Sequence, residues 1–367
     1  MFNLLGWLQH LRILNRGGRS LDEMIEKLAA EAIARGSSED EVIRGIRRGL
    51  EESGVVVAEE LRRIMPRMIR EHTRFRRRFE RNLRKRWGNA LDLYYAVYVA
   101  CQEVGEDYAD RNRATAMSEN DFRFEALVRL HARACTVASE IFALLRTGHA
   151  LGASARARTL HEIAATGFVL AAGTVADAER YLLHEVVDRW KRACQYQSVA
   201  TRLGEEPLSD EEMGVIQDDL NALVDRFGSE FARPYGWAAP IVGKPRPTFR
   251  DLENHVKLDH LRPYYHWFSD SIHAGARAAH EIVQHRGPHA VLLAGASNAG
   301  LWDPAQVAML SLSQMTSTLV LSGIQPTADD LVAVTAISEL RDAAVEAFGE
   351  ADRELERDEA AIQWEVN

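Results

Sequence analysis

Four ionisable residues stand close together in the segment ARARTLHEIAATG, residues 155–167. Arg156, Arg158, His161 and Glu162 open a segment whose later positions are mostly apolar. On a helix, Arg158 would share one flank with His161 and Glu162, which follow it by three and four residues. A buried charge costs several kcal/mol unless it is paired. Two interpretations follow: an Arg158–Glu162 ion pair that orients neighbouring helices, or a polar pocket within a helical bundle.

A second polar stripe lies in residues 262–283, where ionisable and hydroxyl side chains recur every three or four residues. The stripe is either a solvated helix face or part of a site. Dinuclear metal sites in helical bundles require a Glu-x-x-His pair on each of two helices, and only Asp270-x-x-His273 approaches that pattern. We therefore predict no metal site and no cofactor. The stripe consists of His266, Ser269, Asp270, His273, Arg277 and His280.

His131 stands alone among apolar residues at helical spacing, with Leu127 before it and Ala134 after it. We expect it to be a hydrogen-bonded core residue. The alternative is that it turns toward Arg158 and Glu162, because helices consecutive in sequence usually pack together. The sequence has no P-loop, dinucleotide fingerprint, HExxH or GxSxG motif.

The charge of the chain is unevenly distributed. The net charge is −9, yet residues 62–86 contain eleven arginines and one lysine against two glutamates, a local charge of +10. Such a segment is either a solvated face, partly neutralised by the acidic remainder, or a polyanion-binding surface. The candidate nucleic-acid contacts are Arg70, Arg74, Arg77, Arg78, Arg81 and Arg84.

Almost every segment has apolar residues with a period of 3.6, which predicts an all-α fold: a multi-helix bundle with a small N-terminal helical module and a long basic helix. We expect the module at 1–55, the main helical domain at 56–350 and an acidic tail at 351–367. Ser38-x-x-Glu41 predicts a helix start, and Gly36 and Gly54 predict helix ends. The basic helix spans 56–86, with Pro66 at a kink or a start.

The remaining helices are predicted by their periodicity and caps. Four prolines and three glycines predict one long loop at 228–250. The predicted helices are 89–109, 120–147, 152–173, 176–203, 209–227, 251–260, 263–286, 304–323 and 327–350.

Composition bounds the class of protein. The chain has 367 residues, of which 46% are hydrophobic and 27% charged, as in globular proteins. Cys101, Cys135 and Cys194 are too scattered for a disulfide framework or a zinc motif, which favours a reducing cytoplasm. We expect no signal peptide and no membrane span, because the most apolar segments are interrupted by polar residues.

The segment EIFALLRTGHALGASARARTLHEIAATGFVLAAG, residues 140–173, resembles a bacterial family of uncharacterised helical proteins, domain of unknown function 5677. Tyr265, Ser269 and His273 match a later Tyr–Ser–x–x–x–His helix of that family. The resemblance spans roughly 85–285. It implies an all-helical fold and no established activity. It also suggests that the turn with Arg158 and Glu162 and the turn with Ser269 and His273 form two halves of one site.

Arg156-x4-His161 also resembles the catalytic motif of the helical HEPN ribonucleases. That resemblance implies that His and Arg act on the RNA 2′-OH and the scissile phosphate without metal, usually across a dimer. On a regular helix the two side chains point about 140° apart, so a loop must intervene for them to converge.

Two functions therefore remain open, and the sequence does not decide whether the protein is an enzyme. The first is a metal-independent ribonuclease or phosphodiesterase, acting as a toxin or phage-defence effector. Its candidate residues are Arg156, Arg158, His161, Glu162, Ser269 and His273. The second is a non-enzymatic module that uses residues 62–86 to bind nucleic acid or a protein. The expected partners are RNA or another polyanion and a second copy or partner protein, with no membrane.

Overall fold

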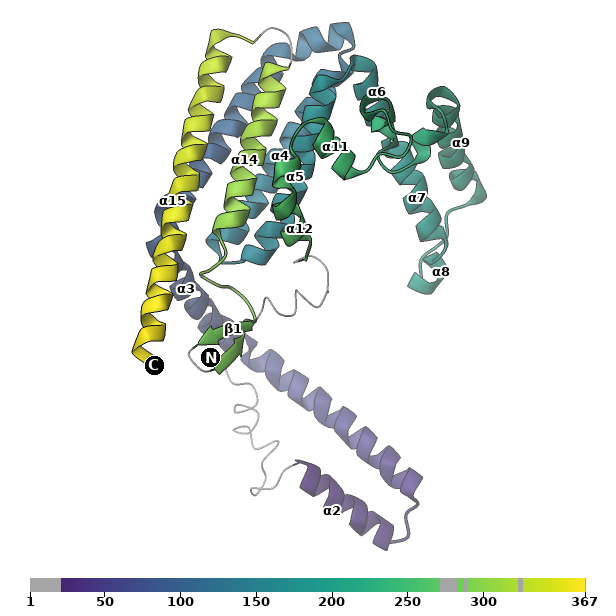
Figure 1. The fold of residues 1–367 in the computed structure, drawn as a ribbon. Coiled ribbons are helices and arrows are strands. Elements are labelled where there is room, and N and C mark those ends of the chain that lie inside the picture. Colours follow the sequence, from purple (N-terminus) through teal and green to yellow (C-terminus); the bar gives the residue numbers. More distant parts are fainter. Residues whose placement is uncertain (1–20, 271–282, 287–288, 323–325, 367) are drawn as a thin grey trace. The chain divides into compact units, whose positions relative to one another are not determined.

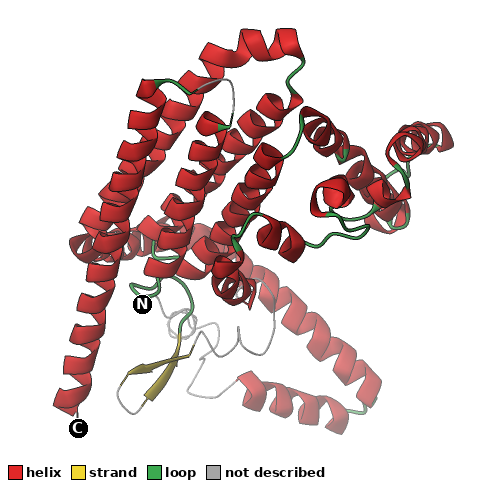
Figure 2. Cartoon of the chain, turned by 45° about the horizontal axis from the view of Figure 1, so that its top comes forward, coloured by secondary structure: helices red, strands yellow, loops and turns green. Residues whose placement is uncertain are grey.

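The chain is helical over most of its length in the computed structural model, which describes residues 21–270, 283–286, 289–322 and 326–366 (Figure 1). It divides into two compact units, residues 1–82 and 83–367, which are described separately. Helices dominate both units (Figure 2), so the predicted all-α class is confirmed. The predicted domain boundaries at residues 55 and 350 stay predictions.

The first unit contains α2 (Leu21–Ala34) and the beginning of α3 (Glu39–Glu119). The chain turns between them at Gly36, whose φ of +92° suits a residue without a side chain. Ser38 and Glu41 form the predicted capping box through two reciprocal backbone contacts. These two sequence signals therefore locate a helix end and a helix start correctly.

The predicted boundaries inside α3 are wrong, because this helix is continuous for 81 residues. It passes through Gly54 and Gly88 and through Pro66, which neither starts nor ends it. In a helix interior, a glycine costs about 1 kcal/mol relative to alanine and a proline about 3 kcal/mol. Packing of α3 in the second unit offsets this cost at Gly88, whereas Gly54 and Pro66 lie in the first unit, where none of residues 25–82 is buried.

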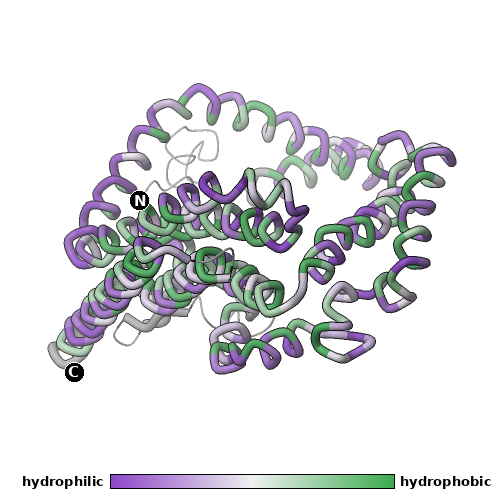
Figure 3. Tube along the Cα trace, turned by 90° about the horizontal axis from the view of Figure 1, so that it is seen from above, coloured by the Kyte–Doolittle hydropathy of each residue, from purple (hydrophilic) through white to green (hydrophobic). Residues whose placement is uncertain are grey.

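The core of the second unit is a bundle of five helices. Residues of α3 from Leu83 onward pack with α4 (Phe122–Arg146), α5 (Ala150–Ala172), α14 (Trp302–Leu321) and α15 (Ala328–Val366). Hydrophobic and hydrophilic residues alternate along these helices (Figure 3), as expected where one face is buried. Trp87 and Tyr94 lie fully buried, and the Tyr94 hydroxyl donates to the carbonyl of Ala138.

The last helix is longer than predicted. α15 continues to Val366, so most of the acidic tail is helical. Ala351 and Leu355 lie four residues apart and are both buried, so the amphipathic pattern persists beyond residue 350.

A lobe of shorter helices follows α5. The predicted helix 176–203 is broken into α6 (Val175–Leu183), α7 (Glu185–Gln197) and α8 (Ala200–Leu203). The predicted start of α9 (Asp210–Phe227) is confirmed by a capping box between Ser209 and Glu212. Val187, Leu220 and Phe231 form the small core of this lobe.

The proline-rich segment 228–250 contains short helical turns: η1 (Ser229–Ala232), η2 (Gly236–Ala238) and α10 (Ala239–Val242). The buried Arg180 holds it in place by donating to the carbonyls of Phe227 and Gly236. α11 (Phe249–His255), η3 (Asp259–Leu261) and α12 (Arg262–Asp270) follow.

The end of the predicted helix 263–286 is a strand instead. β1 (Val283–Arg286) pairs antiparallel with β2 (His289–Leu292), although the periodicity predicts helix through residue 286. The sequence between the strands is Gly287–Pro288, a dipeptide typical of turns and incompatible with a continuing helix. This pair is the only sheet within the described ranges.

None of the helices in the described parts of the chain combines the length and the apolar character needed to span a bilayer.

The core-residue hypothesis for His131 is confirmed. Its Nε2 lies 3.0 Å from Thr316 Oγ1 on α14, and the imidazole packs directly on Gly105 of α3. Burial lowers the pKa of His131 to about 4, so the ring is neutral at pH 7. His131 therefore joins three helices of the bundle and does not reach Arg158 or Glu162.

We expect Gly105→Ala to destabilise the second unit by about 1–3 kcal/mol, the usual cost of overpacking. The added Cβ would lie 2.0 Å from Cε1 of His131, whose ring has no room to move. Gly214→Ala on α9 is the control, because nothing lies within 4 Å of its added Cβ. The control should be neutral or stabilising by up to about 1 kcal/mol. Urea unfolding measures both, and equal stabilities of the two variants would contradict the prediction.

His131 should also make stability depend on pH. Its pKa is about 6.5 in the unfolded chain and lower in the folded one, so the unfolded chain takes up the proton first as the pH falls. The free energy of unfolding should fall by up to about 1.4 kcal/mol per pH unit from about pH 6.5 toward the folded pKa. His131→Gln should flatten the profile between pH 7 and 5. Urea titrations of both proteins at these pH values test this, and parallel profiles would refute it.

Candidate functional site

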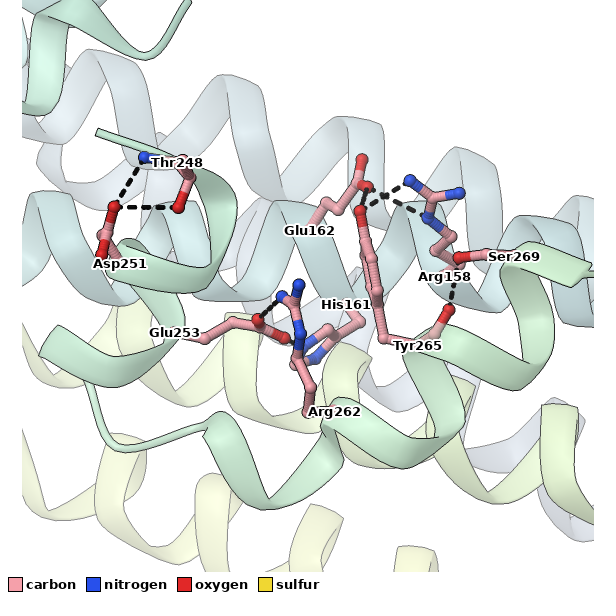
Figure 4. Close-up of polar contacts among 9 residues, drawn as sticks. All are labelled: Arg158, His161, Glu162, Thr248, Asp251, Glu253, Arg262, Tyr265 and Ser269. Carbon is pink, nitrogen blue, oxygen red and sulfur yellow. Dashed lines mark hydrogen bonds and ion pairs between the residues drawn. The ribbon is translucent and has the colours of Figure 1, made fainter. Parts of the chain in front are cut away.

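The polar cluster predicted at the start of α5 is present, and its central contact comes from α12. Arg158 Nη2 donates to the hydroxyl of Tyr265 at 2.6 Å, and that hydroxyl donates to Glu162 Oε1 at 2.8 Å (Figure 4). Arg158 Nε lies 3.3 Å from the same carboxylate oxygen. The Arg158–Glu162 ion pair is therefore formed, with Tyr265 bridging it from the neighbouring helix.

The pair is less buried than we expected. The side chains of Arg158 and Glu162 keep 23% and 33% of their surface exposed, because the ring of Tyr265 covers only one side of them. The guanidinium of Arg158 lies 4.3 Å from the centre of that ring. Burial, followed by the hydrogen bond to Glu162, raises the pKa of Tyr265 to about 12. Tyr265 is therefore a permanent donor at neutral pH and not a base.

A second, fully buried group lies beside this pair. His161 Nε2 lies 2.9 Å from Glu253 Oε1 on α11, and Arg262 of α12 pairs with the other oxygen of the carboxylate. His161 is 2% exposed and Glu253 0%. Burial alone would raise the pKa of Glu253, but the bonds from His161 and Arg262 outweigh it and hold the pKa below its usual value. Because a carboxylate only accepts, His161 donates from Nε2.

Aromatic contacts join the two groups into one cluster. Phe249 of α11 stacks on Tyr265 with ring centres 5.1 Å apart, and the edge of His161 faces Phe249 at 5.8 Å. The guanidinium of Arg262 lies 5.0 Å from the Tyr265 ring. The name "clamp cluster" is used below for Arg158, His161, Glu162, Phe249, Glu253, Arg262 and Tyr265. It fastens α11 and α12 to α5.

Arg156 and His161 do not converge. α5 is a continuous helix here, Arg156 pairs with Glu140 of α4, and His161 points instead to Glu253 of α11. No loop interrupts α5 between these two residues, so nothing brings the two side chains together. The spacing that resembles the HEPN motif therefore does not produce a paired Arg–His site here.

The other half of the predicted site is only partly within the described residues. α12 packs on α5, but the hydroxyl of Ser269 donates to the carbonyl of Tyr265, one turn earlier in its own helix, at 2.6 Å. His273 and the side chain of Asp270 lie outside the described residues. The suggestion that the turn with Ser269 and His273 completes one site with Arg158 and Glu162 therefore stays a prediction.

Glu253 and Arg262, which complete the cluster, were not predicted from the sequence. Glu253 has Arg250 three residues before it and Lys257 four residues after it, a pattern typical of an exposed helix face. Arg262 precedes His266 by four residues and so could extend the polar stripe, but nothing local marks Glu253 as its partner. The decisive contact, between Glu253 and His161, joins positions about ninety residues apart in sequence.

The arginines of α3 that were predicted as nucleic-acid contacts are all exposed. Arg84 differs from the others, because it makes two hydrogen bonds to the carboxylate of Asp92. The other five form no ion pair with any described residue, in contrast to Arg67 and Arg76, which pair with glutamates one turn away. These five, named the arginine surface below, are Arg70, Arg74, Arg77, Arg78 and Arg81.

Comparison with known proteins finds a family model that matches part of the chain. Residues 124–289 are similar to DUF5677, a family of unknown function. The DUF5677 segment contains the whole clamp cluster and begins later than the residue 85 suggested by the resemblance. The arginine surface lies outside it. No curated protein and no solved structure matches the chain.

Among the described residues, no three His, Cys, Asp or Glu side chains are grouped as metal ligands would be. In the clamp cluster each carboxylate is bonded to cations or hydroxyls of the protein itself, so the described part of the DUF5677 segment presents a bonded polar network.

We expect Glu253→Ala to lower the free energy of unfolding by about 3–5 kcal/mol, because it leaves a buried His161 and Arg262 without their carboxylate. Glu162→Ala is the matched control in the same cluster. Its carboxylate is a third exposed, so the loss should be about 1 kcal/mol, the order measured for accessible ion pairs. Chemical denaturation measures both losses, and a smaller loss for Glu253→Ala than for Glu162→Ala would refute this account of the cluster.

Proposed function

We propose that the protein binds nucleic acid through the phosphate backbone, using the arginine surface of α3. The observation that carries the proposal is that five exposed arginines within twelve residues lack an acidic partner among the described residues. Twelve helical residues extend over about 17 Å, a length that fits several consecutive phosphates.

The spacing of these arginines creates repulsion that a polyanion would relieve. Arg70 and Arg74, Arg74 and Arg78, and Arg77 and Arg81 are each four residues apart, on adjacent turns of α3. Each like-charged pair at this spacing destabilises a helix by about 0.2–0.5 kcal/mol. A guanidinium also binds phosphate oxygens through two parallel hydrogen bonds, which a lysine cannot do.

The chemistry of this surface favours contacts to the backbone over contacts to bases. Phe75 lies between two of these arginines in sequence, but four of the five arginines point about 100–160° away from it around the helix, and only Arg78 lies on its flank. The surface therefore has no row of aromatic rings on which successive bases could stack, and arginine–phosphate contacts carry no sequence information. We expect similar affinity for unrelated sequences of equal length.

Binding without cleavage is better supported than the ribonuclease hypothesis. A general acid or base must come within hydrogen-bond reach of its substrate. His161 is buried and engaged by Glu253, and Arg156 is engaged by Glu140 on another helix. The pair suggested by the HEPN spacing is therefore unavailable for chemistry on RNA in this arrangement.

We expect the full-length protein to bind a 20-base-pair duplex with an affinity that falls steeply with salt. Five phosphate contacts give a slope of log affinity against log salt of about −4 to −5. Replacing the five arginines by glutamine should reduce affinity at least about tenfold and flatten that slope. Fluorescence anisotropy from about 50 to 200 mM NaCl, the range over which such contacts weaken strongly, measures both quantities.

The control replaces five other arginines, which are exposed and without an ion pair to a described residue, all in the second unit. It changes the net charge equally and should leave affinity nearly unchanged. Equal losses in both variants would show nonspecific attraction, and no binding by the wild type would refute the proposal. Cleavage of RNA that is abolished by His161→Ala would favour the ribonuclease hypothesis instead. The control positions are Arg133, Arg146, Arg202, Arg246 and Arg250.

A further inference from the structure

The described residues of the first unit form no buried core. From residue 25 to residue 82 every side chain is exposed or only partly buried. Large apolar side chains, among them Leu28, Ile43, Ile69 and Phe75, lie open, and Phe75 keeps 66% of its surface exposed. Helices in globular proteins bury their apolar face against another element. Extended apolar surface of this kind marks an interaction site.

The exposed apolar surface has a groove at one end and the projecting aromatic ring of Phe75 at the other. The groove lies between α2 and α3, has a volume of about 420 Å³ and is lined by apolar residues that include Leu28, Ile46 and Leu50. Gly49 opens it further, because nothing lies within 4 Å of the position that a Cβ would take there. Ile46, Leu50 and Phe75 share one face of α3 to within about 40° around the helix axis.

The charge of α3 changes sign at Leu61. Residues 39–60 contain seven acidic residues and three arginines, a net charge of −4, whereas residues 62–82 contain nine arginines and two glutamates, a net charge of +7. Packed helices lie about 8–10 Å apart, which is no more than the screening length at about 0.1 M salt. The charge pattern therefore influences how a second helix aligns with α3.

We propose that the first unit binds a second copy of itself, with the two α3 helices antiparallel and centred on Leu61. Each acidic half then lies beside the basic half of the other copy, whereas a parallel pair would place the two +7 segments side by side. The same overlap brings Phe75 of one copy opposite Arg47 of the other, beside Ile46 and Leu50 of its groove. Charge and shape thus select the same alignment. It forms a self-complementary twofold interface, the commonest kind in homodimers.

The proposed interface leaves most of the arginine surface accessible. Arg70, Arg74, Arg77 and Arg81 point about 100–160° away from Phe75 around α3, and only Arg78 lies closer, at about 60°. Self-association is therefore tested in the absence of nucleic acid, and at Phe75, which is not part of the arginine surface.

The first test is the oligomeric state of the full chain by sedimentation velocity in the absence of nucleic acid. The wild type should be a dimer, and Phe75→Glu should weaken the dimer at least tenfold, because a carboxylate would enter an apolar groove. The Phe75 ring is mostly exposed in a single copy, so each copy should still fold, which circular dichroism checks. Met117→Glu, 73% exposed and also on α3 but in the second unit, is the control and should remain dimeric. A monomeric wild type, or a Phe75→Glu variant as dimeric as the control, would overturn the proposal.

The second test addresses the direction of pairing. Arg47 and Arg76 are exposed on the same flank of the apolar face and come together only in the antiparallel alignment. Arg47→Cys and Arg76→Cys proteins, in a Cys194→Ser background, should be joined by a short thiol cross-linker when mixed and not when treated separately. The remaining cysteines, Cys101 and Cys135, are buried. Cross-linking of either variant with itself, or no cross-link in the mixture, would exclude the proposed alignment.

Discussion

The apolar face of α3 is the constraint on which the rest of the structure depends, because a helix of 81 residues must cover that face along its length. From Leu83 onward the chain covers it: Trp87, Tyr94 and Val97 are almost completely buried by the helices of the bundle. Before Leu83 the helix carries Phe79, which is partly buried, and Phe75, which is mostly exposed. One long amphipathic helix therefore contributes a buried core face in the second unit and leaves apolar side chains open in the described part of the first.

The clamp cluster performs a different task from the bundle core. Helices α11 and α12 are short, and a short helix gains little stability from its own hydrogen bonds. Their attachment to α5 relies on a few polar contacts: the buried carboxylate of Glu253 between His161 and Arg262, and the hydroxyl of Tyr265 between Arg158 and Glu162. Such networks specify one arrangement because each member has a defined partner. The cluster thus explains why Arg158, His161 and Glu162 occur at the start of a largely buried helix, and Arg156 pairs separately with Glu140 of α4.

The exposed positive charge of α3 and the bonded ionisable residues around α5 lie in different parts of the chain. The arginine surface lies in the first unit, outside the DUF5677 segment, whereas the ionisable residues of that segment that the structure describes around α5 are bonded to one another. A net charge of −9 would argue against nucleic-acid binding if the charge were uniform, but a local surface is what a phosphate backbone contacts. The separation leaves the polar contacts that hold α11 and α12 on α5 unaffected by the charge of the arginine surface.

The sequence by itself determined the helical class, most helix starts and the basic surface, because these depend on neighbours within one or two turns. The capping boxes at Ser38 and Ser209 and the arginine spacing of α3 are local patterns of this kind. It did not determine the continuity of α3, because Gly54 and Pro66 are local signals for a helix end and the helix continues through both. Nor did it reveal the pairing of Glu253 with His161, which is distant in sequence, or the part that Arg262 plays beside them. Only the tertiary structure decided which of the ionisable side chains are bonded and which remain free, since burial and pairing depend on contacts between helices far apart in the chain.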